Sequence, residues 1–230
     1  MIEKNDLFDY GFYIYQNSDY FKFSIDSILL AEFVKFKTRD TILDMCTGNA
    51  PIPLILTTKD NNLKIDAVEI QKEVYDLAVK SINENKLNNI KIYNDDIKKI
   101  ELNKKYDIIT CNPPYFKVGK SSLTNENPIK QVARHEIELT LENVIDIAFK
   151  NLKETGTFYM VHRCERLIET INLLKNKSFG IRRLCFVNTK KTGNAEFFLI
   201  EASKYKKNDP KIKSINIKNL KTYKNIFKEE

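Results

Sequence analysis

The amino-acid sequence predicts an α/β fold in which helices cover both faces of a doubly wound, mostly parallel β-sheet. Short apolar runs alternate with segments of helical periodicity, the order typical of parallel strands joined by helical crossovers. Near the C-terminus, two apolar runs flank a short Thr192-Gly193-Asn194 connection, which favours an antiparallel hairpin. The 230 residues are 42% hydrophobic and 30% charged, as in ordinary globular domains. We therefore expect one sheet of seven strands, one of which is an antiparallel strand from the closing hairpin.

Local patterns place each element of this fold. Apolar residues recur at helical spacing within residues 24–36, and Pro51 stands where the first turn of the next helix is expected. Thr140 has the side chain of a helix N-cap. Further helices are expected at residues 71–85 and 166–175. The seven strands are expected at residues 41–45, 65–70, 90–93, 106–111, 157–161, 182–187 and 197–200.

A segment without clear periodicity follows the fourth predicted strand. Residues 116–134 contain several Ser, Asn, Lys and Gly residues, so we expect a long loop. Loops of this length are often functional. Open α/β sheets bind ligands in a crevice at the carboxyl ends of their strands, and this loop begins at such an end. We therefore expect the functional crevice beside it.

Most of the net charge is concentrated near the C-terminus. The formal net charge is +7, and residues 204–230 contribute +6 of it, with nine lysines against three acidic residues. The chain therefore divides into a domain of residues 1–203 and a basic tail of residues 204–230. Such a tail attracts nucleic-acid phosphates in a salt-dependent, sequence-independent way. The same lysines equally fit a solvated helix, and Arg182 and Arg183 fit either an RNA-facing pair or an edge strand.

The composition excludes several classes of protein. No run approaches the roughly 18 apolar residues of a membrane-spanning helix. The charged first ten residues lack the apolar core of a secretory signal. The four cysteines form no C-x-x-C pair and only two histidines are present, so neither a disulfide framework nor a metal site is expected. We expect a cytoplasmic monomer without a membrane or metal partner.

Residues 44–50, between the first predicted strand and its helix, form a candidate ligand-binding turn. Gly48 lets a ligand approach the backbone closely. A pyrophosphate-binding fingerprint needs three glycines, but Cys46 and Pro51 occupy the other two positions. The sequence therefore disfavours pyrophosphate binding at this turn.

Acidic residues end three successive strands at this edge of the predicted sheet: Asp44, Glu69 and Asp96. A carboxylate after the second strand can accept both hydroxyls of a ribose. A carboxylate after the third strand can accept from an adenine amino group. Each residue alone also fits a local role as a turn, helix-entry or loop acid. Together, the three indicate a pocket for a sugar and an adenine without a pyrophosphate.

The motif Asn112-Pro113-Pro114-Tyr115 directly follows the fourth predicted strand. The prolines stiffen the turn and leave the Pro113 carbonyl to accept a hydrogen bond beside the side-chain oxygen of Asn112. Two neutral oxygens can hold both hydrogens of a planar –NH2 group, and Tyr115 offers a flat face for stacking. A sulfonium methyl donor needs no basic side chain, so positioning suffices for transfer to such an amine. No histidine is well placed near the motif, which argues against an acyl-transfer triad, although outside this context the motif fits an ordinary proline turn.

With these motifs the chain resembles the class I S-adenosylmethionine-dependent methyltransferases. Within that group it resembles the bacterial tRNA (adenine-N6)-methyltransferases that modify adenine 37 of a valine tRNA. The resemblance covers residues 20–203 and implies a Rossmann-like fold, S-adenosyl-L-methionine as methyl donor and tRNA as partner. Cys46 and Ala50 depart from the glycines usual in the cofactor turn. The matching segments are Phe23-Ser24-Ile25-Asp26, residues 44–50, Glu69, Asp96-Ile97, Asn112 to Phe116, and Ala133-Arg134-His135-Glu136.

The resemblance also implies roles for individual residues. The cofactor would be held by Asp44, Cys46, Gly48, Asn49, Glu69, Ile70, Asp96, Ile97 and Asn112. The catalytic motif would be Asn112, Pro113, Pro114 and Tyr115. The target base would be held by Asn112, Pro113 and Tyr115, and Phe116 is a further candidate for substrate binding. Apart from the resemblance, we expect phosphate contacts from Lys117, Lys120, Lys130, Arg134 and the lysines of the tail.

Other functions share parts of this pattern. Methyltransferases of protein glutamine, rRNA adenine or DNA adenine carry the same four-residue motif. Only 43 residues precede Asp44 and 27 follow Ser203, so we do not expect the recognition domains of the protein and DNA enzymes. A non-catalytic RNA-binding module has no use for the paired acceptors. A nicotinamide-dependent oxidoreductase would need the missing glycines.

Overall fold

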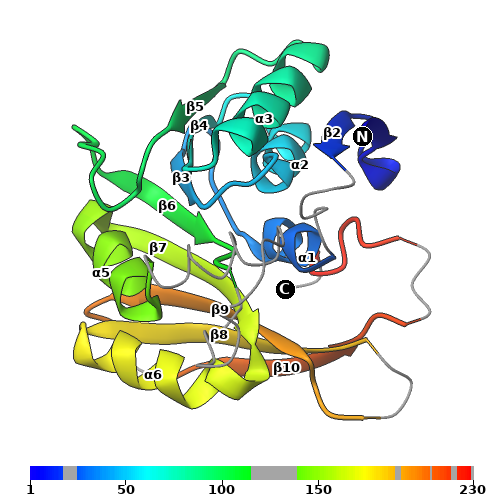
Figure 1. Cartoon of the computed structure of the whole chain (residues 1–230). Coiled ribbons are helices and arrows are strands. Elements are labelled where there is room, and N and C mark those ends of the chain that lie inside the picture. Colours follow the sequence, from blue (N-terminus) through cyan, green and yellow to red (C-terminus); the bar gives the residue numbers. More distant parts are fainter. Residues whose placement is uncertain (18–24, 115–138, 190–192, 208, 219–221, 229–230) are drawn as a thin grey trace, which may run out of the picture.

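The computed structural model describes residues 1–17, 25–114, 139–189, 193–207, 209–218 and 222–228. Its centre is an eight-stranded sheet in the order β10-β8-β9-β7-β6-β3-β4-β5 (Figure 1). The strands are β3 (Thr41–Met45), β4 (Lys64–Glu69), β5 (Ile90–Asn94), β6 (Tyr106–Cys111), β7 (Leu152–Arg163), β8 (Phe179–Asn188), β9 (Phe197–Lys204) and β10 (Lys211–Asn216). The helices are α1 (Ile25–Phe33), α2 (Pro51–Lys59), α3 (Lys72–Glu84), α5 (Leu141–Asn151) and α6 (Leu167–Asn176).

The pairing confirms the predicted doubly wound, mostly parallel sheet. Strands β5, β4, β3, β6 and β7 run parallel to one another, whereas β9 lies antiparallel between β7 and β8. The chain continues from β3 to β4 on one side, and β6 lies on the other side of β3. The strand order therefore reverses at β3, and open α/β sheets bind their ligands at such a point.

The expected seven strands are one too few. The eighth, β10, pairs parallel with β8 and lies in residues 204–230, where we expected a basic tail or a solvated helix. The helical interpretation is therefore wrong for residues 211–216. The strand has no buried face, and its lysines are typical of an exposed sheet edge, so no apolar alternation marked it. Further along, Phe227 is buried and packs edge-to-face on Phe33, with ring centroids 5.2 Å apart.

A small antiparallel hairpin of β1 (Ile2–Asp6) and β2 (Tyr13–Asn17) precedes the sheet domain. A short 3-10 turn, η1 (Phe8–Tyr10), connects its strands. The hairpin packs on α3, where the Tyr15 amide donates to Ser81 Oγ over 2.8 Å and the Tyr13 amide donates to Asn85 Oδ1 over 2.9 Å. The N-terminus is thereby attached to the helix that follows β4.

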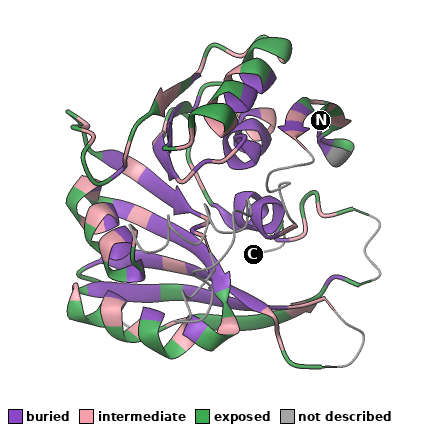
Figure 2. Cartoon of the chain, viewed as in Figure 1, coloured by how far each residue is buried: buried purple, intermediate pink, exposed green. Residues whose placement is uncertain are grey.

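The core lies on both faces of the sheet, and Figure 2 shows its central strands as largely buried. Successive residues of β3 point to opposite faces: Ile42 packs with α1 and α2, whereas Leu43 packs with α5. Helix α5 begins at the predicted cap, because the Thr140 hydroxyl accepts from the Asn143 amide and the Asn143 side chain accepts from the Thr140 amide. These layers hold the carboxyl ends of the central strands in fixed positions.

Two carboxylates, the half-buried Glu201 and the buried Glu32, also connect distant parts of the chain. Glu201 of β9 pairs with Arg183 of β8, which also donates to the Phe33 carbonyl over 2.6 Å. Arg183 is therefore part of the core and does not face RNA, and β8 lies inside the sheet. Glu32 of α1 accepts from the Tyr10 hydroxyl over 2.7 Å and from the Asn225 amide over 2.8 Å. It joins the two ends of the chain to α1.

Candidate functional site

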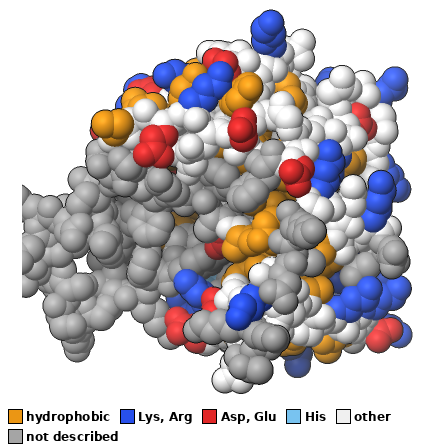
Figure 3. All heavy atoms as spheres, turned by 90° about the vertical axis from the view of Figure 1, so that its right-hand side faces the viewer, with side chains coloured by type: hydrophobic (Ala, Val, Ile, Leu, Met, Phe, Trp, Pro, Cys, Tyr) orange, Lys and Arg blue, Asp and Glu red, His pale blue; other side chains and the backbone are white. Residues whose placement is uncertain are grey.

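The predicted site residues that the structure describes lie at the carboxyl edge of the sheet. Asp44 is the next-to-last residue of β3, Glu69 ends β4, Asp96 follows β5 and Asn112 follows β6. In Figure 1 the arrowheads of β6 and β7 point toward the side of the molecule that Figure 3 presents. The four strands thus bring together side chains that are up to 68 positions apart in the sequence.

The turn after β3 is held in an unusual backbone conformation. Cys46, Gly48 and Ala50 have φ angles of 58°, 59° and 67°, in the left-handed region. For a residue with a Cβ this conformation costs about 1–2 kcal/mol. A Cβ built on Gly48 would meet no protein atom within 4 Å, so the space beside its backbone is open. Strained turns of this kind are common where a ligand approaches the backbone.

Asp44 connects the turn after β3 to strand β6. Its carboxylate is fully buried and accepts from the hydroxyls of Thr47 and Thr110, both over 2.6 Å. Burial raises the pKa of Asp44 to about 7, and the two hydroxyl hydrogen bonds partly oppose this shift. The side chain therefore fixes the turn to the neighbouring strand β6, which is a local role beside the predicted cofactor contact.

Glu69, at the end of β4, binds the backbone of the turn after β3 and the backbone that follows β4. One carboxylate oxygen accepts from the Gly48 amide over 2.8 Å and the other accepts from the Gln71 amide over 2.9 Å. Burial raises the pKa of Glu69. Because Gly48 donates its N–H to this carboxylate, the turn presents a negative group where a pyrophosphate-binding turn presents N–H donors. The Gly48 N–H is therefore already engaged by a side chain of the protein.

Three further predicted residues line the same edge beside β4 and β5. The Asp96 carboxylate accepts from the Lys98 amide over 2.9 Å and lies 3.8 Å from Lys99 Nζ. Ile97 is buried, whereas Ile70 exposes 39% of its surface. Ile70 is the one of these apolar side chains that a ligand at this edge can reach.

The remaining residues of the turn face the protein. Asn49 is buried and its Nδ2 donates to the Tyr15 carbonyl over 3.0 Å, which attaches the turn to β2. Cys46 is half-buried and interacts with Cys111 at the end of β6. Burial raises the pKa of the Cys111 thiol well above its ordinary value, so this thiol stays protonated and unreactive.

The motif predicted to be catalytic is described as far as Pro114. Asn112 is half-buried, Pro113 is buried and Pro114 is half-buried. Asn112 Nδ2 donates to Ser27 Oγ of α1 over 2.8 Å. The predicted base and RNA contacts at Tyr115, Phe116, Lys117, Lys120, Lys130 and Arg134 lie outside the described residues.

Three residues of the site were not predicted from the sequence. Thr47 and Thr110 hold Asp44, and Ser27 holds Asn112. Thr110 is paired with Asp44 across the parallel strands β6 and β3, a register that no local pattern specifies. Ser27 follows the segment Phe23 to Asp26 that carried part of the resemblance, which is the one signal that could have drawn attention to it.

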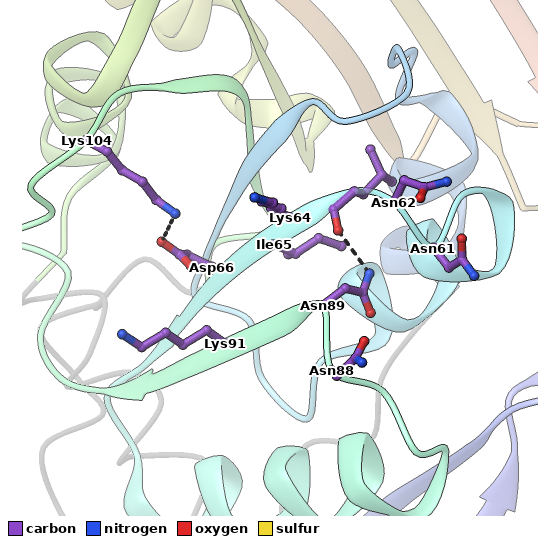
Figure 4. Close-up of a pocket in the computed structure, with 10 residues that line it drawn as sticks. Asn61, Asn62, Lys64, Ile65, Asp66, Asn88, Asn89, Lys91 and Lys104 are labelled. Carbon is purple, nitrogen blue, oxygen red and sulfur yellow. Dashed lines mark hydrogen bonds and ion pairs between the residues drawn. The ribbon is translucent and has the colours of Figure 1, made fainter.

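A cavity of about 420 Å³ lies at the opposite ends of the strands, their amino ends. It is lined by residues at the amino ends of β4 and β5, among them Lys64, Lys91 and Asn89, as Figure 4 shows. Its one buried carboxylate, Asp66, accepts from the Tyr106 hydroxyl over 2.6 Å and pairs with Lys104 over 2.9 Å. This cavity is separate from the site at the carboxyl edge.

Neither a metal centre nor a membrane span is found in the described part of the chain. Its His, Cys, Asp and Glu side chains form no group of three or more that could hold a metal ion. His162 is buried in β7, where burial lowers its pKa to about 4 and keeps the ring neutral at physiological pH. Among the described residues, no helix combines the length and the apolar character needed to cross a bilayer.

Comparison with known proteins agrees with this geometry. The model of the methyltransferase small domain family matches residues 20–185. A tRNA1(Val) (adenine(37)-N6)-methyltransferase of Pseudoalteromonas translucida is 30% identical over 167 residues, which cover 72% of this chain and 70% of the relative. A protein of the same name from Tolumonas auensis is 30% identical over 182 residues, which cover 78% of this chain and 75% of the relative.

A solved structure shows the same fold. The crystal structure of a predicted O-methyltransferase from Agrobacterium tumefaciens is similar with a TM-score of 0.67 at 15% identity, covering 87% of this chain and 91% of that protein. At this identity the likeness concerns the fold alone. The family model covers residues 20–185, which include the acid-lined turn and the Asn-Pro-Pro segment that follows β6. The chain therefore belongs to the methyltransferase small domain family.

Proposed function

We propose that the protein transfers a methyl group from S-adenosylmethionine to the exocyclic N6 of an adenine in tRNA. The two relatives are named for this reaction at adenine 37 of a valine tRNA, and we propose the same position here. The observation on which the proposal mainly depends is the position of Asn112. It lies at the carboxyl end of β6, next to the acid-lined turn after β3.

The residues of the turn fit S-adenosylmethionine. The Glu69 carboxylate accepts from the backbone amides of Gly48, Gln71 and Ile70, and a carboxylate has about four acceptor positions, so one position remains for a ribose hydroxyl. Gly48 leaves the space beside the backbone open, and Ile70 offers an apolar surface to the adenine ring. The site carries carboxylates, and the Gly48 N–H is bound to Glu69 and not directed at a phosphate. This arrangement suits a positively charged ligand without phosphates.

In the proposed reaction, positioning by the motif after β6 provides most of the catalysis. S-adenosylmethionine supplies a methyl group on a positively charged sulfur, which is electrophilic enough to be attacked without a metal ion. The Asn112 side-chain oxygen and the Pro113 carbonyl accept the two N–H bonds of the target amine. Held in this way, the nitrogen keeps the direction of its lone pair fixed, and loss of orientational freedom before the reaction lowers the barrier. As the N–CH3 bond forms, the bond from sulfur to the methyl group would break to leave a neutral thioether, and the amine would lose one proton to solvent.

An adenine of the anticodon loop suits such a pocket. It is unpaired, so turning it out of the RNA costs less than extracting a base from a duplex. On the face shown in Figure 3, hydrophobic side chains gather near the centre, and both basic and acidic side chains lie around them. The apolar centre of this face suits a base turned out of the RNA.

Substitution of Asn112 tests the proposal. Asn112→Ala should abolish methyl transfer from labelled S-adenosylmethionine to bulk tRNA, because one acceptor of the amine is lost. Binding of the cofactor should persist, because the other residues predicted to hold it, Gly48 and Glu69 among them, are unchanged. Asn88→Ala, at an exposed asparagine near the opposite edge, is the matched control and should keep both. Full turnover by the Asn112 variant would refute its role. Transfer to DNA or to a protein amide, with none to tRNA, would refute the substrate class.

We further propose that the protein acts as a monomer in the cytoplasm and without a metal ion. The transfer needs neither a Lewis acid nor a second active site. Size-exclusion chromatography with light scattering should give the mass of one chain, and a chelator should leave the transfer rate unchanged. A dimer, or loss of activity that added metal restores, would contradict this part of the proposal.

A further inference from the structure

We propose that Ser27 is a positioning residue whose hydroxyl holds the side-chain amide of Asn112 with its oxygen turned toward the target amine. This inference rests on the function proposed above, since it concerns how the methyl acceptor is held. Asn112 Nδ2 donates to Ser27 Oγ over 2.8 Å, although the two residues are 85 positions apart. The first helix and the end of β6 therefore meet at the side chain to which we assign the acceptor role.

The orientation of this amide decides whether it can hold an amine. An asparagine amide has a carbonyl oxygen on one side and an –NH2 group of similar size on the other. Only the oxygen accepts a hydrogen bond from the N–H of an amine. If the amide turned by 180°, its own N–H bonds would oppose those of the substrate. With Nδ2 bound to Ser27, the oxygen lies on the other side of the amide.

Ser27 is itself held on a fixed element. Its residue surface is only 6% exposed, and its backbone amide donates to Asp26 Oδ1 over 3.0 Å. Helix α1 packs against α2 and against β7, and every residue from Asp26 to Phe33 is buried. A hydroxyl on such a helix places its partner more precisely than a hydroxyl on a loop would.

On the other side of Asn112, the two prolines restrict the backbone. Pro113 and Pro114 fix their φ angles near −65° and remove two N–H groups from the turn. The backbone of the motif and the amide of Asn112 are thus restrained by different parts of the chain, by the prolines and by Ser27. Loss of the hydroxyl is therefore expected to loosen the amide without moving the backbone.

A matched pair of variants separates the hydroxyl from the shape of the side chain. Threonine and valine have nearly the same shape, but only Ser27→Thr retains a hydroxyl. Ser27→Thr should keep kcat within about threefold of the original protein, whereas Ser27→Val should lower it about tenfold or more. The KM for tRNA and the Kd for S-adenosylmethionine should stay the same in both. Ser27→Ala, which adds no branch, should repeat the result of the valine variant.

A second readout follows the amide itself. Side-chain 15N relaxation of the Asn112 Nδ2 group, identified by its loss in Asn112→Ala, reports how rigidly the amide is held. The amide should be ordered in the original protein and in Ser27→Thr, and mobile in Ser27→Val. Equal kcat values or equal amide order in the threonine and valine variants would overturn the inference. Absence of transfer to adenine by the original protein would refute the proposed function instead, while amide relaxation still decides whether Ser27 fixes Asn112.

Discussion

At the scale of single residues, the hydrogen bond from the Gly48 amide to the Glu69 carboxylate distinguishes this turn from a phosphate-binding turn. Glycine-rich turns that bind phosphates direct their N–H groups at the anion. Here the Gly48 N–H donates to Glu69, and both oxygens of this buried carboxylate already hold the backbone on either side. In the proposed site, this side chain therefore disfavours a phosphate at Gly48 and accepts the ribose.

We predict that Glu69→Gln weakens the binding of S-adenosylmethionine by about tenfold or more. The amide nitrogen of glutamine cannot accept, so one contact to the backbone or to the ribose is lost, which costs about 1–3 kcal/mol. Isothermal titration calorimetry measures the change in Kd. Glu73→Gln, at an exposed position in the first turn of α3, is the matched control and should bind as the original protein does. Unchanged affinity in the Glu69 variant would remove this residue from the cofactor site.

The raised pKa of Asp44 predicts a pH dependence of stability. The carboxyl titrates near 3.8 when exposed in the unfolded chain and near 7 in the fold. Between these values the folded protein binds more protons than the unfolded chain, so the free energy of unfolding decreases as pH rises through this window. The slope approaches about 1.4 kcal/mol per pH unit. Above the folded pKa the penalty for the buried charge is complete and constant.

Urea denaturation of the original protein and of Asp44→Asn isolates this contribution. The variant carries no titrating group at position 44, and other groups such as His162 are common to both proteins. The difference in unfolding free energy, original minus variant, should decrease by about 3 kcal/mol from pH 5 to pH 8. A difference that is independent of pH would show that Asp44 does not titrate in this range.

At the scale of elements, the parts of the fold that local patterns specify were predicted correctly. The predicted range of β6 coincides with the observed strand, and Thr140 caps α5 as expected, because apolar alternation and capping chemistry lie within the segment itself. The hairpin of β1 and β2 and the strand β10 were not predicted. Their stability comes from partners far along the chain, α3 and β8, and not from a pattern of their own.

The candidate site was predictable to the same extent. Asp44, Glu69 and Asn112 stand at the ends of strands, so their shared edge follows from the order of parallel strands alone. Their hydrogen-bond partners depend on register and on helix packing. For this reason the contact of Ser27 with Asn112 becomes visible only in the folded chain.

Residues after β10 take part in the core, and a substitution can measure this. Phe227→Ala should lower the free energy of unfolding by about 3 kcal/mol, since a buried aromatic ring in contact with Phe33 is lost. In a chain of this size, this corresponds to a decrease in Tm of roughly 6–12 °C. Lys228→Ala, at the next and exposed position, should leave Tm unchanged. Equal Tm values for the two variants would mean that residue 227 does not pack on the domain in solution.

At the scale of the whole molecule, the excess of lysine in residues 204–230 is the main electrostatic asymmetry of the chain. Deleting this segment would also remove β10 and Phe227, so a deletion would confuse charge with stability. Substitution of exposed lysines avoids this difficulty. Lys211 lies on β10 and Lys218 follows it, and both side chains are exposed.

We predict that the double variant Lys211→Gln and Lys218→Gln flattens the salt dependence of tRNA binding. If both lysines contact phosphates, the slope of log Kobs against log salt concentration should lose roughly 1.4–1.8 in magnitude. Fluorescence anisotropy between 50 and 300 mM salt measures it. The control is Lys64→Gln with Lys91→Gln, two exposed lysines at the opposite edge, which should leave the slope unchanged. Equal slopes in both double variants would show that these C-terminal lysines are only solvated.

The central proposal is that this protein methylates one unpaired adenine of a tRNA at N6. Nucleoside mass spectrometry of a valine tRNA transcript, after incubation with the purified protein and S-adenosylmethionine, tests it most directly. The account predicts one N6-methyladenosine per transcript, mapped to position 37 and absent when that adenine is replaced by guanine. A methyl group on another atom or another nucleotide, or an unmodified transcript beside a methylated protein or DNA, would contradict it.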